Sequence, residues 1–198
     1  MSQTAPSWLH GALGSPRAGH AGLAIAKLGS ERTFGRGGFS IKSPAFAAGD
    51  ELDPCFTADE EDAVAPPFEW TAPPPGALEI VLIAEDADNA APSPFCHWLV
   101  WGMPGQKGQL LEGEAPPRVG KNAHGNSEWL LPEVTHGDPE HQFVFQLFAL
   151  ELPMTLMPGA TREDVIASME GHVTACAVTT ATYAGSEAED EGGWDEEF

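Results

Sequence analysis

Apolar and polar residues alternate along the chain in a way that predicts a mostly β structure between residues 38 and 184. Short runs rich in Val, Ile, Phe and Trp are separated by stretches rich in Pro and Gly, which are typical of turns. We expect a strand at each of the six runs, the first of them starting at Phe39. The six runs are 39–41, 68–70, 78–84, 97–103, 143–150 and 173–183.

One helix is expected late in the chain. Thr161 is a suitable N-cap, and Asp164 follows three residues later, which is close to a capping box. Apolar residues then recur at helical spacing, at positions 165, 166, 169 and 173. Several short strands with one or two late helices indicate a β-rich α+β domain. Residues 105–140 show little periodicity, and an irregular segment of this length inside a domain is usually functional.

Composition and charge narrow the possible functions. The chain has 198 residues, enough for one domain with tails, and 42% of them are hydrophobic. Nine Lys and Arg stand against thirty Asp and Glu, so the net charge is −21. Proteins bind nucleic acids and anionic membranes largely through Lys and Arg. We therefore expect neither nucleic-acid binding nor stable membrane insertion.

The charge is unevenly distributed and suggests three regions. Residues 1–37 carry +3 and the rest of the chain −24. We expect residues 1–37 to be an N-terminal extension that lies on the body or on a partner, with disorder as the alternative. Residues 38–184 should form the domain. Residues 185–198, rich in Asp and Glu, should be a disordered tail unless Trp194 or Phe198 docks.

The three cysteines favour a reducing compartment. Cys55, Cys96 and Cys176 form no CxxC pair, and their odd number makes a disulfide framework or zinc knuckle an unsuitable interpretation. The first thirty residues lack the basic start and apolar run of a signal peptide. We expect a cytoplasmic protein with no metal and no cofactor.

Polar residues at strand ends are the candidates for a binding site. Asp86 and Asp88 follow the apolar run 78–84, and His97 and His141 each stand where a run begins. Ends of neighbouring antiparallel strands share one edge of a sheet, so we expect Asp86, His97 and His141 to converge in a small pocket. Imidazole N–H groups there would bind an anion, with Asp86 orienting one ring. The alternative is that each histidine only closes a loop by a hydrogen bond.

No sequence motif supports catalysis. The chain has no GxSxG elbow, no P-loop, no dinucleotide fingerprint and no HExxH. We therefore assign no catalytic residue and expect that the protein is not an enzyme.

Five segments together resemble the phosphatidylethanolamine-binding protein family, and in particular its bacterial branch of Raf-kinase-inhibitor-like proteins. Their order and spacing match over about residues 38–184. The segments are GFSIKSPAF (38–46), CFTADEEDAVAPPFEW (55–70), EDADNAAPSPFCHWLVWGMP (85–104), HGDPEHQFVFQLFAL (136–150) and GATREDVIASMEGHV (159–173).

The resemblance implies a fold and a pocket. The expected fold is a central antiparallel sheet with a second, smaller sheet and a few peripheral helices. The expected pocket accepts phosphate, a phosphoryl group or a similar anion. The family's acidic segment falls on Asp86–Ala90, which includes Asp88, and its pocket histidine falls on His97. The family segment that begins with glycine and contains a histidine falls on Gly137–Phe143, which includes His141.

Several positions depart from the family pattern. Ala87 and Ala90 stand where the family has prolines, so we expect the loop there to be less rigid. Gln142 stands where the family has an arginine that we would expect to brace the acidic loop, and Phe143 replaces a tyrosine. The proline-rich rim of the family pocket is replaced by residues 129–136, in which Trp129 is the residue that we expect to touch a ligand. These changes bear on the strength of anion binding.

Three functions remain open. The first, which we favour, is a non-enzymatic protein that binds a small anionic ligand and has a regulatory role. The second is a protein-interaction module, or an inhibitor of a kinase or protease, with an unknown protein partner. The third is an enzyme, for example a His/Asp hydrolase, or a metal site in which His136 and His141 act together with Asp138 and Glu140. A homodimer is possible, because bacterial relatives are often dimers.

Overall fold

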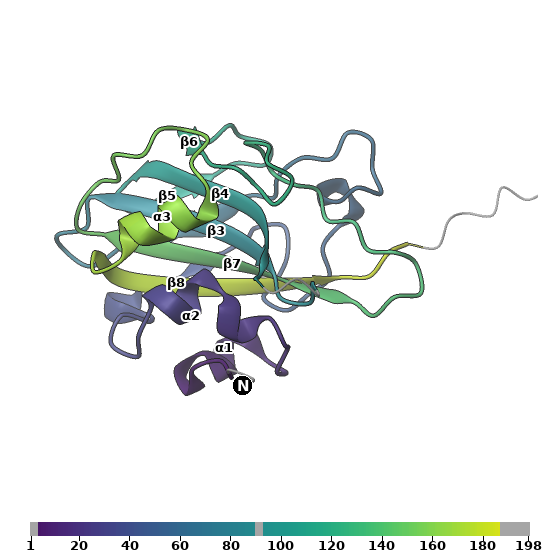
Figure 1. Cartoon of the computed structure of the whole chain (residues 1–198), viewed down its shortest axis with the longest axis horizontal. Helices are drawn as coiled ribbons and strands as arrows, with labels where there is room; N and C mark the ends of the chain where they lie inside the picture. Colours follow the sequence, from purple (N-terminus) through teal and green to yellow (C-terminus); the bar gives the residue numbers. More distant parts are fainter. Residues whose placement is uncertain (1–3, 90–92, 187–198) are drawn as a thin grey trace, which may run out of the picture.

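The computed structural model describes residues 4–89 and 93–186 and places a five-stranded antiparallel sheet at the centre of the molecule (Figure 1). Its strand order is β6-β4-β3-β7-β8. The three inner strands, β4, β3 and β7, coincide with the strongest apolar runs of the sequence. The strands are β3 (Glu79–Asp86), β4 (Phe95–Pro104), β6 (Arg118–Val119), β7 (His141–Leu150) and β8 (Val173–Tyr183).

A second, smaller sheet packs against one face of the first. Its three antiparallel strands have the order β1-β2-β5. The strands are β1 (Ile41–Lys42), β2 (Phe68–Trp70) and β5 (Gly108–Leu110). Two sheets with a few short helices confirm the expected β-rich α+β fold with a central antiparallel sheet. The α-helices are α1 (His10–Leu13), α2 (Ala24–Leu28) and α3 (Arg162–Met169), and the 3₁₀ turns are Ser7–Leu9, His20–Gly22, Arg36–Gly38 and Pro54–Phe56.

The large sheet separates two hydrophobic cores, because successive side chains of a strand point to opposite faces. In β3, Ile80 and Leu82 pack toward the small sheet, whereas Val81 and Ile83 pack toward the helices. Strand β7 alternates in the same way along its whole length. Both faces of these strands are buried, which explains why the sequence there is almost continuously apolar.

The local predictions are confirmed for α3 and need a correction in the long irregular stretch. Thr161 Oγ1 accepts a hydrogen bond from Asp164 N, and Asp164 Oδ2 accepts one from Thr161 N, both at 3.2 Å, so the helix begins with a capping box. Residues 105–140 are not wholly irregular, because they contain β5 and β6. The predicted runs 39–41 and 68–70 each place two apolar residues around a polar one. Gly108–Leu110 and Arg118–Val119 each contain a single large apolar residue, so the sequence shows no alternation there.

Residues 4–37, which we call the N-terminal arm, pack on the face of the large sheet opposite the small sheet. Leu9, Leu13, Leu23 and Ile25 are buried there together with side chains of β3, β7 and α3. Figure 1 shows α1 and α2 beside β8, with α3 lying across the neighbouring strands. The family-like part of the chain is therefore covered on this face by the arm.

A buried polar network holds α2 on the sheet. Glu85 Oε2 accepts hydrogen bonds from Ala24 N at 2.9 Å and from Gln146 Nε2 at 2.8 Å. Gln146 Oε1 accepts one from Ile25 N at 2.7 Å. The Arg162 guanidinium pairs with Glu85 and also donates to Gly22 O at 3.0 Å. Side chains of the sheet thus satisfy the free N–H groups at the start of the helix, which lacks a cap of its own.

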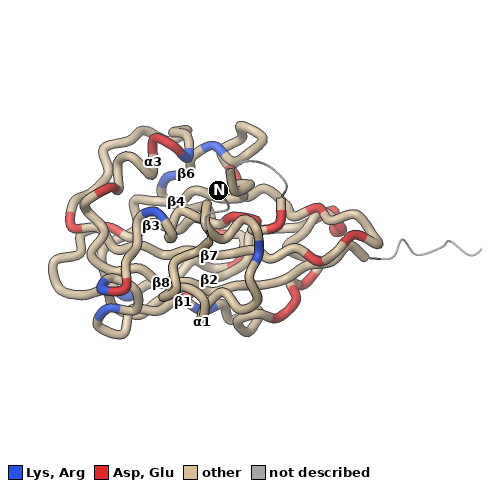
Figure 2. Tube along the Cα trace, turned by 60° about the horizontal axis from the view of Figure 1, so that its bottom comes forward, with Lys and Arg blue, Asp and Glu red and all other residues tan. Residues whose placement is uncertain are grey.

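Acidic positions are spread over many loops of the molecule, whereas Lys and Arg are few and scattered (Figure 2). Within the described residues, no helix combines the length and apolar character needed to cross a membrane. Most of the expected acidic tail, residues 187–198 with Trp194 and Phe198, lies outside the described residues, and so does Ala90.

Candidate functional site

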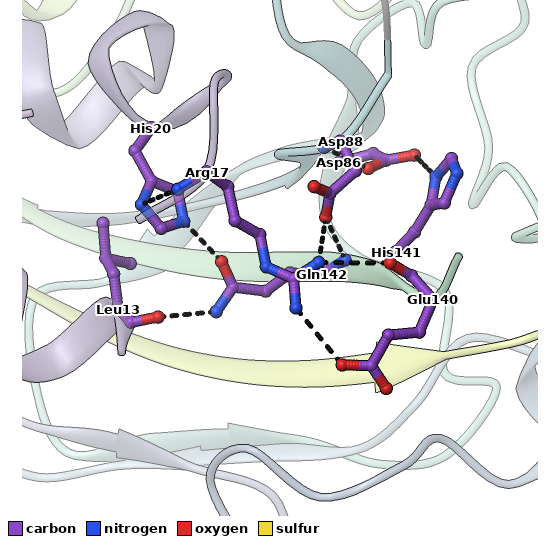
Figure 3. Close-up of polar contacts among 8 residues, drawn as sticks. All are labelled: Leu13, Arg17, His20, Asp86, Asp88, Glu140, His141 and Gln142. Atoms are coloured by element: carbon purple, nitrogen blue, oxygen red, sulfur yellow. Dashed lines mark hydrogen bonds and ion pairs between the residues drawn. The ribbon is translucent and has the colours of Figure 1, made fainter. Parts of the chain in front are cut away.

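Asp86 and His141 form a hydrogen-bonded pair at one edge of the large sheet. Asp86 ends β3 and lies opposite Phe143 of β7, so His141, two residues away on the same face, reaches the carboxylate. His141 Nδ1 lies 2.6 Å from Asp86 Oδ2 (Figure 3). The Asp86 side chain is 5% exposed and the His141 ring 25%. Because a carboxylate accepts, Nδ1 carries the proton and Nε2 is left for other contacts.

A bulge in β4 directs His97 toward the same side of the sheet. Ala84 pairs with Trp98 and Glu85 with Cys96, so His97 is the extra residue of the register shift. His97 and Trp98, although adjacent, both contact the ring of Trp129, with centroid distances of 5.8 and 5.7 Å. A regular strand would place these neighbours on opposite faces. The bulge is therefore what brings the His97 imidazole to the site.

The His97 ring is anchored through one nitrogen. Its Nδ1 lies 2.6 Å from the carbonyl oxygen of Leu130, which can only accept, so Nδ1 is the donor. The Leu130 amide in turn donates to His97 O at 2.9 Å. Among the described residues no hydrogen bond to His97 Nε2 is recorded. This nitrogen is thus the one that a ligand could use.

Phe143 links the two histidines. Its ring centroid lies 5.2 Å from that of His97, edge to face, and 6.5 Å from that of His141, stacked. The structure thus gathers Asp86, His97 and His141 around one aromatic side chain. Phe143, where the resemblance led us to expect a tyrosine, contributes an apolar wall and no hydroxyl group.

Burial sets the electrostatics of His97. Desolvation lowers the pKa of its imidazole, and the neighbouring His124 and His141 act in the same direction. The hydrogen bond to Leu130 and the charge of Asp86 act in the opposite direction but do not outweigh burial. At neutral pH the ring is therefore neutral, with Nδ1 protonated and Nε2 an acceptor.

Gln142 does not brace the acidic loop through its side chain. Position 142 alternates with 141 and 143 and so faces the N-terminal arm. Gln142 Oε1 lies 2.5 Å from His20 Nε2, and Gln142 Nε2 donates to Leu13 O at 2.7 Å. The residue that contacts the acidic loop is Arg17, whose Nη1 lies 2.5 Å from Asp88 Oδ2 (Figure 3). Asp88 thus faces the arm.

Trp129 and Gly137, two of the expected ligand-binding residues, support the site through packing and backbone shape. Trp129 is 9% exposed, donates from Nε1 to Phe56 O at 3.1 Å, and forms a wall beside His97. The face of Trp129 away from the core borders a cavity of about 630 Å³, which Trp98 and His124 also line. Gly137 lies in the exposed turn before β7 with a φ of +88°, a conformation that favours glycine. Its backbone shapes the turn that leads to His141.

Three residues near the site were missed by reasoning from sequence. His124 lies beside Phe95, with ring centroids 5.6 Å apart, and came from the irregular stretch that was expected to be functional. Arg17 and His20 belong to the N-terminal arm. Its positive charge indicated that it would lie on the acidic body of the protein, but not where. Nothing local in the sequence links Arg17 to Asp88 or His20 to Gln142.

The other candidate chemistry finds no support in the described part of the chain. No group of three or more His, Cys, Asp or Glu side chains there could hold a metal ion, so residues 136–141 do not assemble a metal site.

Cys96, next to His97, is buried, and desolvation raises the pKa of its thiol. A thiol that stays protonated is a poor nucleophile.

Comparisons with known proteins agree with this fold. The family model described as phosphatidylethanolamine-binding protein matches residues 42–184. A protein named UPF0098 from Aquifex aeolicus is 33% identical over 161 residues, which cover 77% of this chain and 93% of the relative. The N-terminal arm, residues 4–37, lies outside the family match.

Two solved structures share the architecture. The phosphatidylethanolamine-binding protein homolog CT736 from Chlamydia trachomatis superposes with a TM-score of 0.69 at 27% identity, covering 75% of this chain and 98% of that one. Escherichia coli YbcL, described as a new member of the mammalian family, gives a TM-score of 0.68 at 19% identity, covering 75% and 99%, which shows the shared fold. With its family match, its relatives and its two sheets, the chain belongs to the phosphatidylethanolamine-binding protein family.

Proposed function

We propose that this protein binds a small phosphoryl or other anionic ligand at Asp86, His97 and His141, without catalysing a reaction, and that this binding has a regulatory role. The observation that carries the proposal is the 2.6 Å contact between Asp86 and His141. A buried carboxylate holds the imidazole in one orientation, with Nε2 directed away from Asp86. In its doubly protonated form, His141 offers Nε2–H to an anion.

His97 supplies a hydrogen-bond acceptor, whereas His141 supplies a donor. Its pKa is lowered by burial, so at neutral pH its Nε2 accepts a hydrogen bond rather than donating one. A monoprotonated phosphoryl group carries oxygens that accept from His141 and one O–H that donates to His97. The pair of histidines therefore suits a hydrogen phosphate or the monoanion of a phosphate monoester better than a fully ionised oxyanion.

Titration calorimetry with inorganic phosphate and phenyl phosphate tests the proposal. We expect the wild type to bind both ligands, and to bind them more strongly at pH 6 than at pH 8, because each ligand then carries more protons that can be donated to His97. His141→Ala and His97→Ala should each weaken binding at least tenfold. Equal affinity in the wild type and both variants would refute the site.

His172→Ala is the matched control. His172 also pairs with a carboxylate, Glu151, at 3.4 Å, but this pair is exposed and lies at the opposite end of β7 from His141. Its removal should leave phosphate affinity unchanged. A loss of affinity in this variant as well would show that bulk charge, and not the site, governs binding.

We also infer a cytoplasmic location. Cys55, Cys96 and Cys176 are all free thiols, and the last two are buried. Free buried thiols are typical of proteins in reducing compartments. Cell fractionation with an antibody to the protein would test this, and recovery in a membrane or secreted fraction would contradict it.

A further inference from the structure

We propose that Arg17 of the N-terminal arm is a positioning residue of the anion site. It holds the acidic loop, residues 86–89, against the start of β7 and neutralises carboxylates beside the bound anion. This inference rests on the proposed function. Arg17 lies outside the part of the chain that matches the family.

The Arg17 guanidinium bridges the two segments that carry the site. Its Nη1 lies 2.5 Å from Asp88 Oδ2 and donates to Glu140 O at 3.1 Å, while its Nη2 lies 3.2 Å from Glu140 Oε1. Asp88 comes two residues after Asp86, and Glu140 directly precedes His141. One side chain therefore ties together the backbone on both sides of the Asp86–His141 pair, as Figure 3 shows.

A chain of hydrogen bonds connects Arg17 to His141. Asp88 Oδ2, which pairs with Arg17, also accepts from Gln142 N at 2.7 Å. Asp88 N donates to Asp86 Oδ1 at 2.8 Å, and Asp86 Oδ2 pairs with His141. If Asp88 is released, the loop loses the contact that sets both its own conformation and the direction of the Asp86 carboxylate. Arg17 thus acts on His141 through these two carboxylates.

The arm has further attachments at the same place that do not use the Arg17 side chain. Gly19 N donates to Ala87 O at 3.0 Å, and an added Cβ on Gly19 would lie only 2.3 Å from that oxygen. His20 and Leu13 both bind the Gln142 side chain. Truncating Arg17 therefore removes the guanidinium while the arm stays in place. A change of affinity in this variant then reports on the guanidinium and not on loss of the arm.

Electrostatics gives the guanidinium its effect on affinity. Asp86, Asp88 and Glu140 put three carboxylates around a site that is proposed to bind an anion. Arg17 pairs with two of them. The Arg17 and Asp88 side chains are 19% and 23% exposed, so water screens the charge only partly. Loss of the guanidinium should weaken anion binding by about fivefold to tenfold.

The test uses the full chain, inorganic phosphate as the probe, and two readouts. Calorimetry at pH 6 should show the fivefold to tenfold loss in Arg17→Ala and in Arg17→Gln, with partial recovery in Arg17→Lys. Hydrogen exchange should show faster exchange of the Gln142 amide in the two neutral variants, because that amide donates to Asp88. Arg36→Ala is the control, since it removes another arm cation whose Nη1 donates to Thr174 O at 3.2 Å, away from the site.

Each outcome of these measurements either supports or overturns the proposed role of Arg17. Wild-type affinity in Arg17→Ala or Arg17→Gln overturns the role of Arg17 and leaves the proposed function intact. An equal loss in Arg36→Ala overturns it too, because the effect would then be one of net charge. Should the alanine variant not fold, Arg17→Gln, which keeps the length of the side chain, provides the result. If the wild type binds no phosphate, the proposed function fails first and this inference fails with it.

Discussion

Oδ2 of Asp86 lies 2.6 Å from Nδ1 of His141, although 55 residues separate the two in the chain. The carboxylate is nearly buried, whereas the imidazole is one quarter exposed. A fixed acceptor behind an accessible ring is an arrangement that orients an imidazole. The edge of the large sheet therefore holds the His141 ring in a defined position.

Replacing Asp86 by Asn should weaken phosphate binding about tenfold at pH 6, because a neutral amide orients the His141 imidazole less firmly than a carboxylate does. Calorimetry measures the loss. Glu151→Gln, which removes the carboxylate of the exposed Glu151–His172 pair, is the control and should leave the affinity unchanged. Tighter phosphate binding in Asp86→Asn would show that Asp86 acts mainly by repulsion.

His97 should make the free energy of unfolding depend on pH. Burial lowers its pKa in the folded protein, so below about pH 6.5 the unfolded chain binds the proton more readily. The contribution of His97 is complete above that pH and is lost as pH falls toward the folded-state pKa. Urea unfolding at pH 7.5 and 5.5 should show a smaller loss of stability in His97→Phe than in the wild type.

The control for His97→Phe is His10→Phe, which changes an exposed imidazole of the arm. It should retain the pH dependence of the wild type. An unchanged pH dependence in His97→Phe would mean that the His97 imidazole is solvated in the folded state.

Arg162→Met should lower the free energy of unfolding by about 3–5 kcal/mol, because it leaves Glu85 buried without a charged partner. Adding Glu85→Gln to this variant should restore at least half of the loss. Lys42→Met, which breaks an exposed ion pair with Glu69 at 3.5 Å, should cost less than about 1 kcal/mol. Urea denaturation measures all three, and equal effects of Arg162→Met and Lys42→Met would contradict the prediction.

Gly19→Ala should destabilise the attachment of the arm by about 1–3 kcal/mol, because the new methyl group would meet Ala87 O and displace the hydrogen bond made by Gly19 N. Gly11→Ala is the matched control: position 11 lies in α1, and a Cβ there meets nothing within 4 Å. It should be neutral or slightly stabilising. Thermal unfolding of both variants measures the difference, and identical melting temperatures would mean that the arm is not held there.

Local pattern was sufficient for much of the fold. The runs at 78–84 and 143–150 became β3 and β7, and the Thr161–Asp164 pair became a capping box. Each of these depends on residues within one element, which periodicity and capping rules can describe. Strands β5 and β6 were not predicted, because each contains a single large apolar residue and therefore shows no alternation.

Their positions at strand ends were enough to predict that Asp86, His97 and His141 lie close together. They did not indicate how His97 comes to face the other two residues. The bulge in β4 depends on pairing with β3, and no local feature of the sequence marks it. Gln142 was interpreted through the arginine that it replaces. The alternation of β7 instead turns its side chain toward the arm.

By itself, the sequence determined where strands form, which of their faces are apolar, and that carboxyl and imidazole groups stand at their ends, because these properties follow from neighbours a few residues away. Only the tertiary structure decided that Arg17 meets Asp88, 71 residues on, and that His20 meets Gln142, 122 residues on. Such contacts depend on which segment covers the open face of the large sheet. That choice is made by the burial of Leu9, Leu13 and Ile25 against the whole sheet, and a linear pattern does not contain it.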